Sequence, residues 1–126
     1  MIFWPPHRQP GRLRAAAYAV AVAVLLYLCL APGRDLPSVA LWDKAEHAIA
    51  WFVLAAIGLA FWPGRPGRVA VFALVFGAVI EVLQATLPFG RDGDWHDWVA
   101  DSLGVAAALL AWAAILGLAR RAAARA

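Results

Sequence analysis

The chain has 126 residues, of which 64% are hydrophobic and 15% charged, and its mean hydropathy is +0.72. Soluble domains carry about a quarter charged residues, so this composition excludes an ordinary soluble protein and indicates an integral membrane protein. The net charge of +3 and the pI near 9.8 do not indicate a nucleic-acid partner, because the arginines flank apolar segments and form no basic face with aromatic platforms.

Four apolar segments follow one another along the chain, separated by prolines and charged residues. They predict transmembrane helices near residues 13–31, 42–62, 69–88 and 96–118. Each segment has about 20 residues, enough to cross a hydrocarbon core of about 30 Å, and a backbone surrounded by lipid must be helical. We therefore expect an all-α membrane protein, a bundle of four transmembrane helices that occupies residues 13–118 as one domain.

The first apolar segment has basic residues ahead of it, as a signal peptide does. Its stretch from Ala15 to Ala31 is nevertheless longer than the apolar region of a signal peptide, which has about 7–15 residues. Leu28 precedes Cys29, whereas a lipoprotein cleavage site needs a small residue there. We therefore expect an uncleaved helix. Because Cys29 is the single cysteine, no intramolecular disulfide can form, and we expect it to serve in packing.

The charges are sorted between alternate gaps. Eight of the eleven basic residues lie in the two terminal segments and in the gap after the second span: Arg8, Arg12, Arg14, Arg65, Arg68, Arg120, Arg121 and Arg125. All eight acids lie in or beside the other two gaps: Asp35, Asp43, Glu46, Glu81, Asp92, Asp94, Asp97 and Asp101. The positive-inside rule then predicts that both termini, residues 1–12 and 119–126, are basic cytoplasmic segments of a multi-pass protein.

Three spans carry ionisable residues in the half of the membrane away from the termini. Asp43 and His47 share a helix face at i, i+4, and Asp101 lies one turn deeper than Asp97. Glu81 lies roughly 10 Å below the outer end of its helix. An isolated acid in the membrane costs about 2.5–3.5 kcal/mol, so these groups should pair with one another. The sequence therefore predicts one polar site that opens to the extracytoplasmic side, formed by Asp43, Lys44, His47, Glu81, Gln84, Arg91, Asp94, Asp97 and Asp101.

Small residues continue two of these helix faces toward the cytoplasm. Gly77 precedes Glu81 by one turn, and Gly104 follows Asp101 by about one turn. Because small residues let membrane helices approach closely, we expect these two glycines to lie at helix contacts. The inner halves of the spans hold Ala, Val, Leu and Gly without ionisable residues, which opposes a transport path through a monomer.

Several of the polar residues come in an order that resembles a known family. The pattern is Asp43-Lys44-x-x-His47, Glu81-x-x-Gln84, Arg91 and Asp94 in a short loop, and Asp97-x-x-x-Asp101-x-x-Gly104. It resembles the VanZ-like family of small bacterial integral membrane proteins over about residues 41–118. One departure is Asp101, which stands where the family often has Asn. The resemblance implies a protein of the bacterial inner membrane and cell envelope. The family's namesake is associated with glycopeptide (teicoplanin) resistance, although most members lie outside resistance clusters.

The sequence favours a site that binds or acts on a cell-envelope or lipid-linked component, with Lys44, His47 and Arg91 available for phosphate or carboxylate. One alternative is a membrane enzyme that uses acid–base or metal-assisted hydrolysis at the same residues. No nucleophile stands out, and no H-x-x-x-H or C-x-x-C pair is present, so we assign no catalytic residue, metal or cofactor. A second alternative is a structural subunit of an envelope complex, in which the polar residues cap helices or join them.

Overall fold

The computed structural model describes residues 5–32, 43–88 and 92–125. All regular secondary structure in these ranges is helical: a short 3-10 turn, η1 (Pro6–Arg8), precedes four α-helices, α1 (Gly11–Leu30), α2 (Asp43–Phe61), α3 (Pro66–Thr86) and α4 (Trp95–Ala123). Each α-helix is long and apolar enough to cross a membrane. The predicted all-α fold with four membrane-spanning helices is therefore confirmed.

Two helix boundaries differ by more than two residues from the predicted spans, for clear physical reasons. Helix α3 begins at Pro66, ahead of the predicted 69, because proline is well suited to the first position of a helix. Helix α4 continues past 118 to Ala123, since this segment is rich in alanine and has Arg120 and Arg121 in its last turn, where cations favour the helix dipole. Trp42, at the predicted start of the second span, lies outside the described residues.

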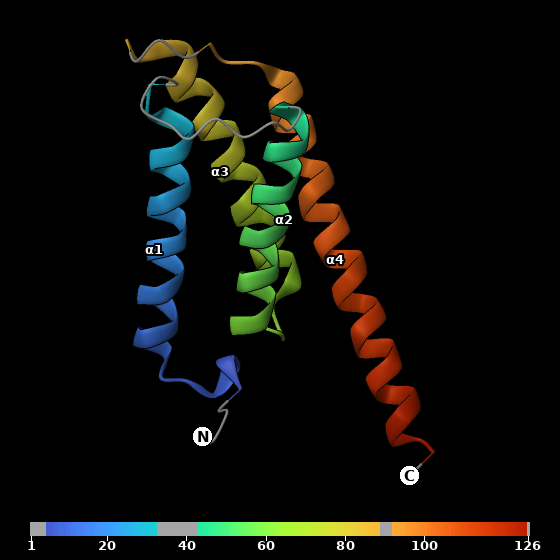
Figure 1. The fold of residues 1–126 in the computed structure, drawn as a ribbon. Helices are drawn as coiled ribbons and strands as arrows, with labels where there is room; N and C mark the ends of the chain where they lie inside the picture. The colour runs from blue at the N-terminus through green and yellow to red at the C-terminus, as the bar shows by residue number, and fades with distance from the viewer. Residues whose placement is uncertain (1–4, 33–42, 89–91, 126) are drawn as a thin grey trace.

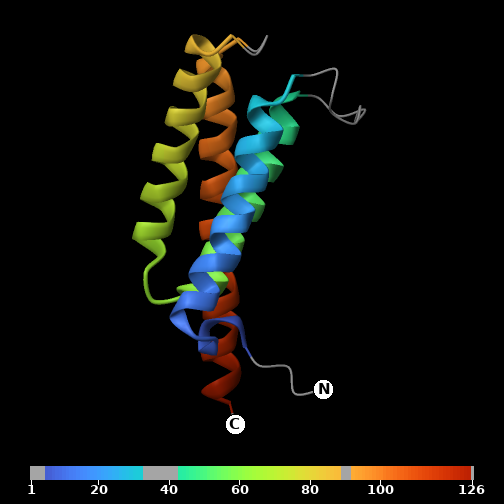
Figure 2. The same ribbon diagram turned by 90° about the vertical axis from the view of Figure 1, so that its left-hand side faces the viewer.

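The helices run up and down, so that both termini lie at one end of the bundle (Figure 1). Helices α2 and α4 share the most extensive contact, α3 packs against both, and α1 makes fewer contacts with α2 and α3. The C-terminal part of α4 extends beyond the other helices, as both Figure 1 and Figure 2 show. We call the end opposite the termini the polar end, because it carries the described acids of α2, α3 and α4.

The contact between α2 and α4 depends on a glycine. A Cβ atom placed on Gly104 of α4 would overlap the carbonyl oxygen of Ala48 on α2 and lie 3.0 Å from the backbone nitrogen of Phe52. The two backbones therefore approach more closely than any side chain at Gly104 would allow, as expected for small residues at a membrane helix contact. This approach brings the first turns of α2 and α4 together at the polar end.

The core below the polar end is apolar and centred on a tryptophan. Trp51 of α2 is fully buried, its indole Nε1 donates a hydrogen bond to the Ala73 carbonyl of α3 at 2.9 Å, and its ring stacks on Phe76. At the opposite end, Arg14 of α1 donates to the Phe61 carbonyl oxygen at 2.6 Å and satisfies one of the carbonyls left open where α2 ends. Hydrogen bonds thus join α2 to α3 in the core and to α1 at its last turn.

Candidate functional site

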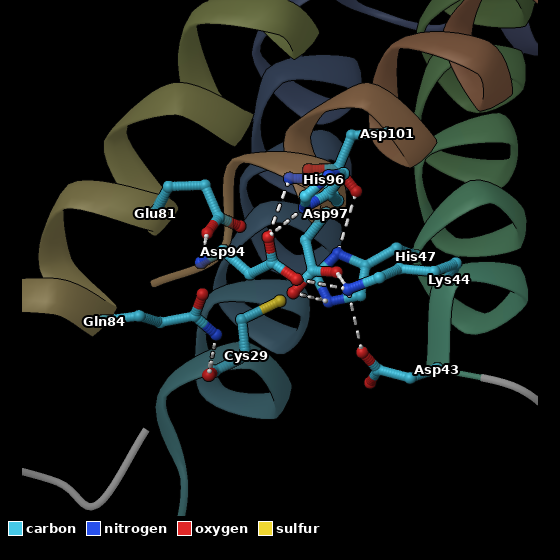
Figure 3. Close-up of polar contacts among 10 residues, drawn as sticks. All are labelled: Cys29, Asp43, Lys44, His47, Glu81, Gln84, Asp94, His96, Asp97 and Asp101. Carbon is cyan, nitrogen blue, oxygen red and sulfur yellow. Dashed lines mark hydrogen bonds and ion pairs between the residues drawn. The ribbon is translucent and has the colours of Figure 1, made fainter. Parts of the chain in front are cut away.

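Most of the predicted site residues meet at the polar end, between the first turns of α2 and α4 and the last turns of α3. Figure 3 shows their side chains pointing toward one another from these three helices. We use the name polar cluster for the seven residues Asp43, Lys44, His47, Glu81, Asp94, Asp97 and Asp101. Three of them, His47, Asp97 and Asp101, are buried although all three side chains can carry charge.

Lys44 lies among three carboxylates. Its ammonium nitrogen donates to Oδ2 of Asp94 at 2.7 Å and to Oδ1 of Asp97, and it lies 3.6 Å from Oδ2 of Asp43. An ammonium group has three donors and no acceptor, and two of the donors are used by Asp94 and Asp97, while Asp43 adds an ion pair. Lys44 therefore holds the start of α4 against the start of α2 and has little free charge to offer an anion.

His47 lies deeper in the cluster, between two aspartates of α4. Its Nδ1 lies 2.9 Å from Oδ1 of Asp101, and its Nε2 lies 3.7 Å from Oδ2 of Asp97. The imidazole ring also stacks on Trp51, with 5.9 Å between ring centroids and an interplanar angle of 19°. These contacts fix the orientation of the imidazole. Asp101 contacts a nitrogen at the edge of the ring, and the Trp51 ring stacks on its face.

Asp94 connects the loop before α4 to the cluster. As the N-cap of α4 it accepts a hydrogen bond from the backbone nitrogen of His96 at 2.9 Å, and its own backbone nitrogen donates to Oε2 of Glu81 at 2.7 Å. The hydrogen bond from Lys44, followed by those from His96, lowers the pKa of the Asp94 carboxyl well below its usual range. Asp94 therefore caps the N-terminus of α4.

Three buried oxygen atoms near the cluster have no hydrogen-bond partner within the described part of the chain. They are Oδ2 of Asp101, Oε1 of Glu81 and Oε1 of Gln84. Buried polar atoms in folded proteins are nearly always paired, with protein groups or with water, so an unpaired acceptor at this depth needs an explanation. A ligand that donates hydrogen bonds, a water molecule or a cation would each provide it.

Two predicted site residues are not part of the cluster. Gln84 is buried, but its Nε2 donates to the Cys29 carbonyl oxygen of α1 at 2.9 Å, so it joins α3 to α1. Arg91 lies outside the described residues. The two predicted packing glycines do lie at helix contacts, since a Cβ atom on Gly77 would come within 3.0 Å of Oδ2 of Asp101, and Gly104 meets α2 as described above.

Two tryptophans that support the cluster, Trp51 and Trp98, were not among the residues predicted from the sequence. Trp51 lies under the imidazole, and Trp98 of α4 donates its Nε1 to the Leu74 carbonyl oxygen at 2.9 Å. The spacing of Trp51 at four residues from His47 places both on one helix face and could have indicated the stacking. His96 was not among the predicted site residues either, and its Nδ1 lies 2.7 Å from Oδ1 of Asp94.

The cluster is acidic overall. Five carboxyl groups face one lysine and one histidine, so acids outnumber bases even when His47 is protonated. Ionised carboxylates only accept hydrogen bonds, so the arrangement is suited to cations and to hydroxyl or amine donors. Ser102, the hydroxyl nearest in sequence to Asp101, donates to the Trp98 carbonyl oxygen of its own helix at 2.8 Å and is occupied there.

Comparison of the chain with protein-family models, with curated proteins and with solved structures gave no match.

Proposed function

We propose that this chain is a VanZ-like protein of the bacterial cytoplasmic membrane whose polar cluster binds a lipid-linked component of the cell envelope. One observation carries the proposal: ionisable side chains from α2, α3 and α4 meet at one end of a membrane-spanning bundle. Ionisable groups within membrane spans are costly and commonly serve a function. The order and spacing of the polar motifs between Asp43 and Gly104 support the family assignment.

The arginine distribution supports an extracytoplasmic position for the cluster. The described arginines lie in η1, in α1, around the α2–α3 turn and at the end of α4, away from the polar end. With those arginines in the cytoplasm, the cluster lies near the head groups of the outer leaflet. Lipid-linked intermediates of the envelope present their polar groups at this depth.

The pairing within the cluster favours particular ligand groups. Lys44 and His47 already contact carboxylates, so binding of a phosphate by either of them would require these ion pairs to open. The unpaired oxygens of Glu81 and Asp101 instead call for hydrogen-bond donors. We therefore expect the ligand to present hydroxyl, amide or amine groups, as the sugar and peptide portions of cell-wall precursors do.

The main alternative is that the cluster only joins the helices. A purely structural network would gain most by satisfying all of its buried polar atoms, because a half-satisfied network is less stable than an apolar contact. Two unpaired buried oxygens within the cluster, on Glu81 and Asp101, favour the binding site over this alternative. The link to glycopeptide (teicoplanin) resistance is part of the proposal only through the family resemblance.

Replacing Glu81 by glutamine is expected to weaken binding of a polyprenyl-linked amino-sugar precursor at least tenfold, about 1.4 kcal/mol. The reason is that a charge-assisted hydrogen bond is roughly twice as strong as a neutral one. Native mass spectrometry of the protein in nanodiscs measures the bound fraction, with phosphatidylglycerol as the competing lipid.

The matched control is Glu46→Gln, which removes an acid from the first turn of α2 that is not part of the cluster. It should bind like the wild type. Equal binding by the wild type and Glu81→Gln, or no preference for the precursor over phosphatidylglycerol, would contradict the proposal.

A further inference from the structure

Three potential metal ligands come together in the deepest part of the cluster, one from each of three helices. His47 of α2, Glu81 of α3 and Asp101 of α4 each offer a nitrogen or carboxylate oxygen, and these atoms lie within 4.8 Å of one another. His47 is buried and Asp101 is completely buried, while Glu81 is partly buried. The three side chains therefore lie close together in a part of the bundle that is largely protected from bulk solvent.

Two of the three unpaired oxygens belong to residues of this group. Asp101 is completely buried, yet its Oδ2 has no partner among the described residues, and the same holds for Oε1 of Glu81. Oδ2 of Asp101 faces Gly77, because a Cβ atom there would lie 3.0 Å from it. Gly77 precedes Glu81 by one turn of α3, so the free oxygen of Asp101 is directed toward the helix face that carries Glu81.

The separation of the histidine and aspartate atoms suits a shared ion. Nδ1 of His47 and Oδ1 of Asp101 lie 2.9 Å apart. Two ligands that each bind an ion at about 2.1 Å lie about 3.0 Å apart at the right angles of an octahedral site and about 3.4 Å apart at the tetrahedral angle. A cation could thus replace the proton between these two atoms with little movement of either side chain.

The positive charge of Lys44 makes the group of His47, Glu81 and Asp101 a better cation site than a neighbouring group of residues. Asp43, His47 and Asp97 also lie close enough to hold an ion, but the Lys44 ammonium already pairs with Asp97 and lies beside Asp43. A divalent cation there would be repelled by the ammonium, or would have to displace it. Lys44 contacts neither Glu81 nor Asp101 in any ion pair of the described residues.

We propose that His47, Glu81 and Asp101 form a binding site for one divalent transition-metal ion. One imidazole and two carboxylates suit ions of the Mn²⁺, Fe²⁺ and Zn²⁺ class, whereas Ca²⁺ and Mg²⁺ prefer oxygen ligands alone. The ion would occupy the unpaired oxygens and offset the excess of acids in the cluster. Three protein ligands leave open positions for water or for a ligand group. The inference concerns the same oxygens of Glu81 and Asp101 that the proposed function assigns to donor groups of the envelope component, so it rests on that site and gives it a different occupant.

The test uses the full-length protein in detergent, stripped with a chelator and titrated separately with Mn²⁺ and Zn²⁺. We expect one ion per chain by isothermal titration, and binding at least tenfold weaker in Asp101→Asn and in Glu81→Gln. Each substitution keeps the side-chain size and an oxygen acceptor, so the second remains informative if the first does not fold. Glu46→Gln should bind like the wild type.

A spectroscopic measurement identifies the histidine directly. Pulsed electron paramagnetic resonance of the Mn²⁺-loaded protein should show coupling to an imidazole nitrogen, and the coupling should be absent in His47→Gln. The inference is overturned if neither ion binds, if the variants bind as the wild type does, or if Ca²⁺ displaces Mn²⁺ at equal concentration. Binding of the amino-sugar precursor by chelated protein is measured alongside, so that loss of the metal inference is distinguishable from failure of the proposed function.

Discussion

Replacing Trp51 by alanine is expected to lower the free energy of unfolding by about 3–5 kcal/mol, the usual cost of truncating a buried tryptophan. Trp51 is completely buried and is among the largest such side chains of the described chain. Truncation would open a cavity between α2 and α3 and leave the Ala73 carbonyl without its indole donor. It would also remove the ring that stacks on His47, so the cluster should lose order together with the core.

The change in the free energy of unfolding is measured by titrating the protein in dodecylmaltoside micelles with dodecyl sulfate until it unfolds. Trp95→Ala is the control, because Trp95 is 66% exposed and its loss should cost less than about 0.5 kcal/mol. Trp51→Phe should fall between the two, since it keeps most of the volume and loses the hydrogen bond. A Trp51→Ala protein as stable as Trp95→Ala would show that the core is not built around this residue.

Replacing Gly104 by leucine is expected to cost on the order of 3 kcal/mol, at the upper end of the range for overpacking. The atoms that a Cβ would meet belong to the backbone of α2 at Ala48 and Phe52, so no side chain can rotate away to make room. The helices α2 and α4 would have to separate. Because Lys44 and His47 on α2 pair with acids on α4, their separation would also break the ion pairs of the cluster.

Gly117→Leu provides the matched control on the same helix. No atom lies within 4 Å of a Cβ placed on Gly117, so this substitution should be close to neutral. The same micelle unfolding assay serves, and cross-linking of cysteines introduced into α2 and α4 reports whether the helices have separated. Equal stabilities for the two leucine variants would contradict the close approach at Gly104.

Hydropathy and charge were sufficient to predict the four helices, because a lipid-exposed backbone has few alternatives to a helix. The depth of His47, Glu81 and Asp101 along their helices also followed from counting residues at 1.5 Å each. Helix rotation was harder to predict. Gln84 lies three residues after Glu81, about 60° away around the helix, and this difference turns its side chain toward Cys29 on α1.

The pairing partners could not be predicted because they depend on how the helices pack. Lys44 bonds with Asp94 across 50 residues of sequence and also with Asp97, and this pairing requires the α2–α4 contact to be known. Trp98 lies near the predicted start of the fourth span, and its indole donates a hydrogen bond to a carbonyl of α3. Hydrophobicity alone does not distinguish a ring that faces lipid from one that bonds a neighbouring helix.

The most direct test of whether the polar cluster is functional uses two variants, Glu81→Gln and Glu46→Gln. For each, the amount of folded protein and the phenotype in cells are measured together. Both variants and the wild type are expressed in bacteria that lack the gene, and sensitivity to glycopeptides and other cell-wall antibiotics is measured per unit of folded protein. Glu81→Gln is expected to accumulate like the wild type but to lose the cellular phenotype, while Glu46→Gln keeps it. A phenotype that only follows the amount of folded Glu81→Gln protein would show that the cluster serves to join the helices.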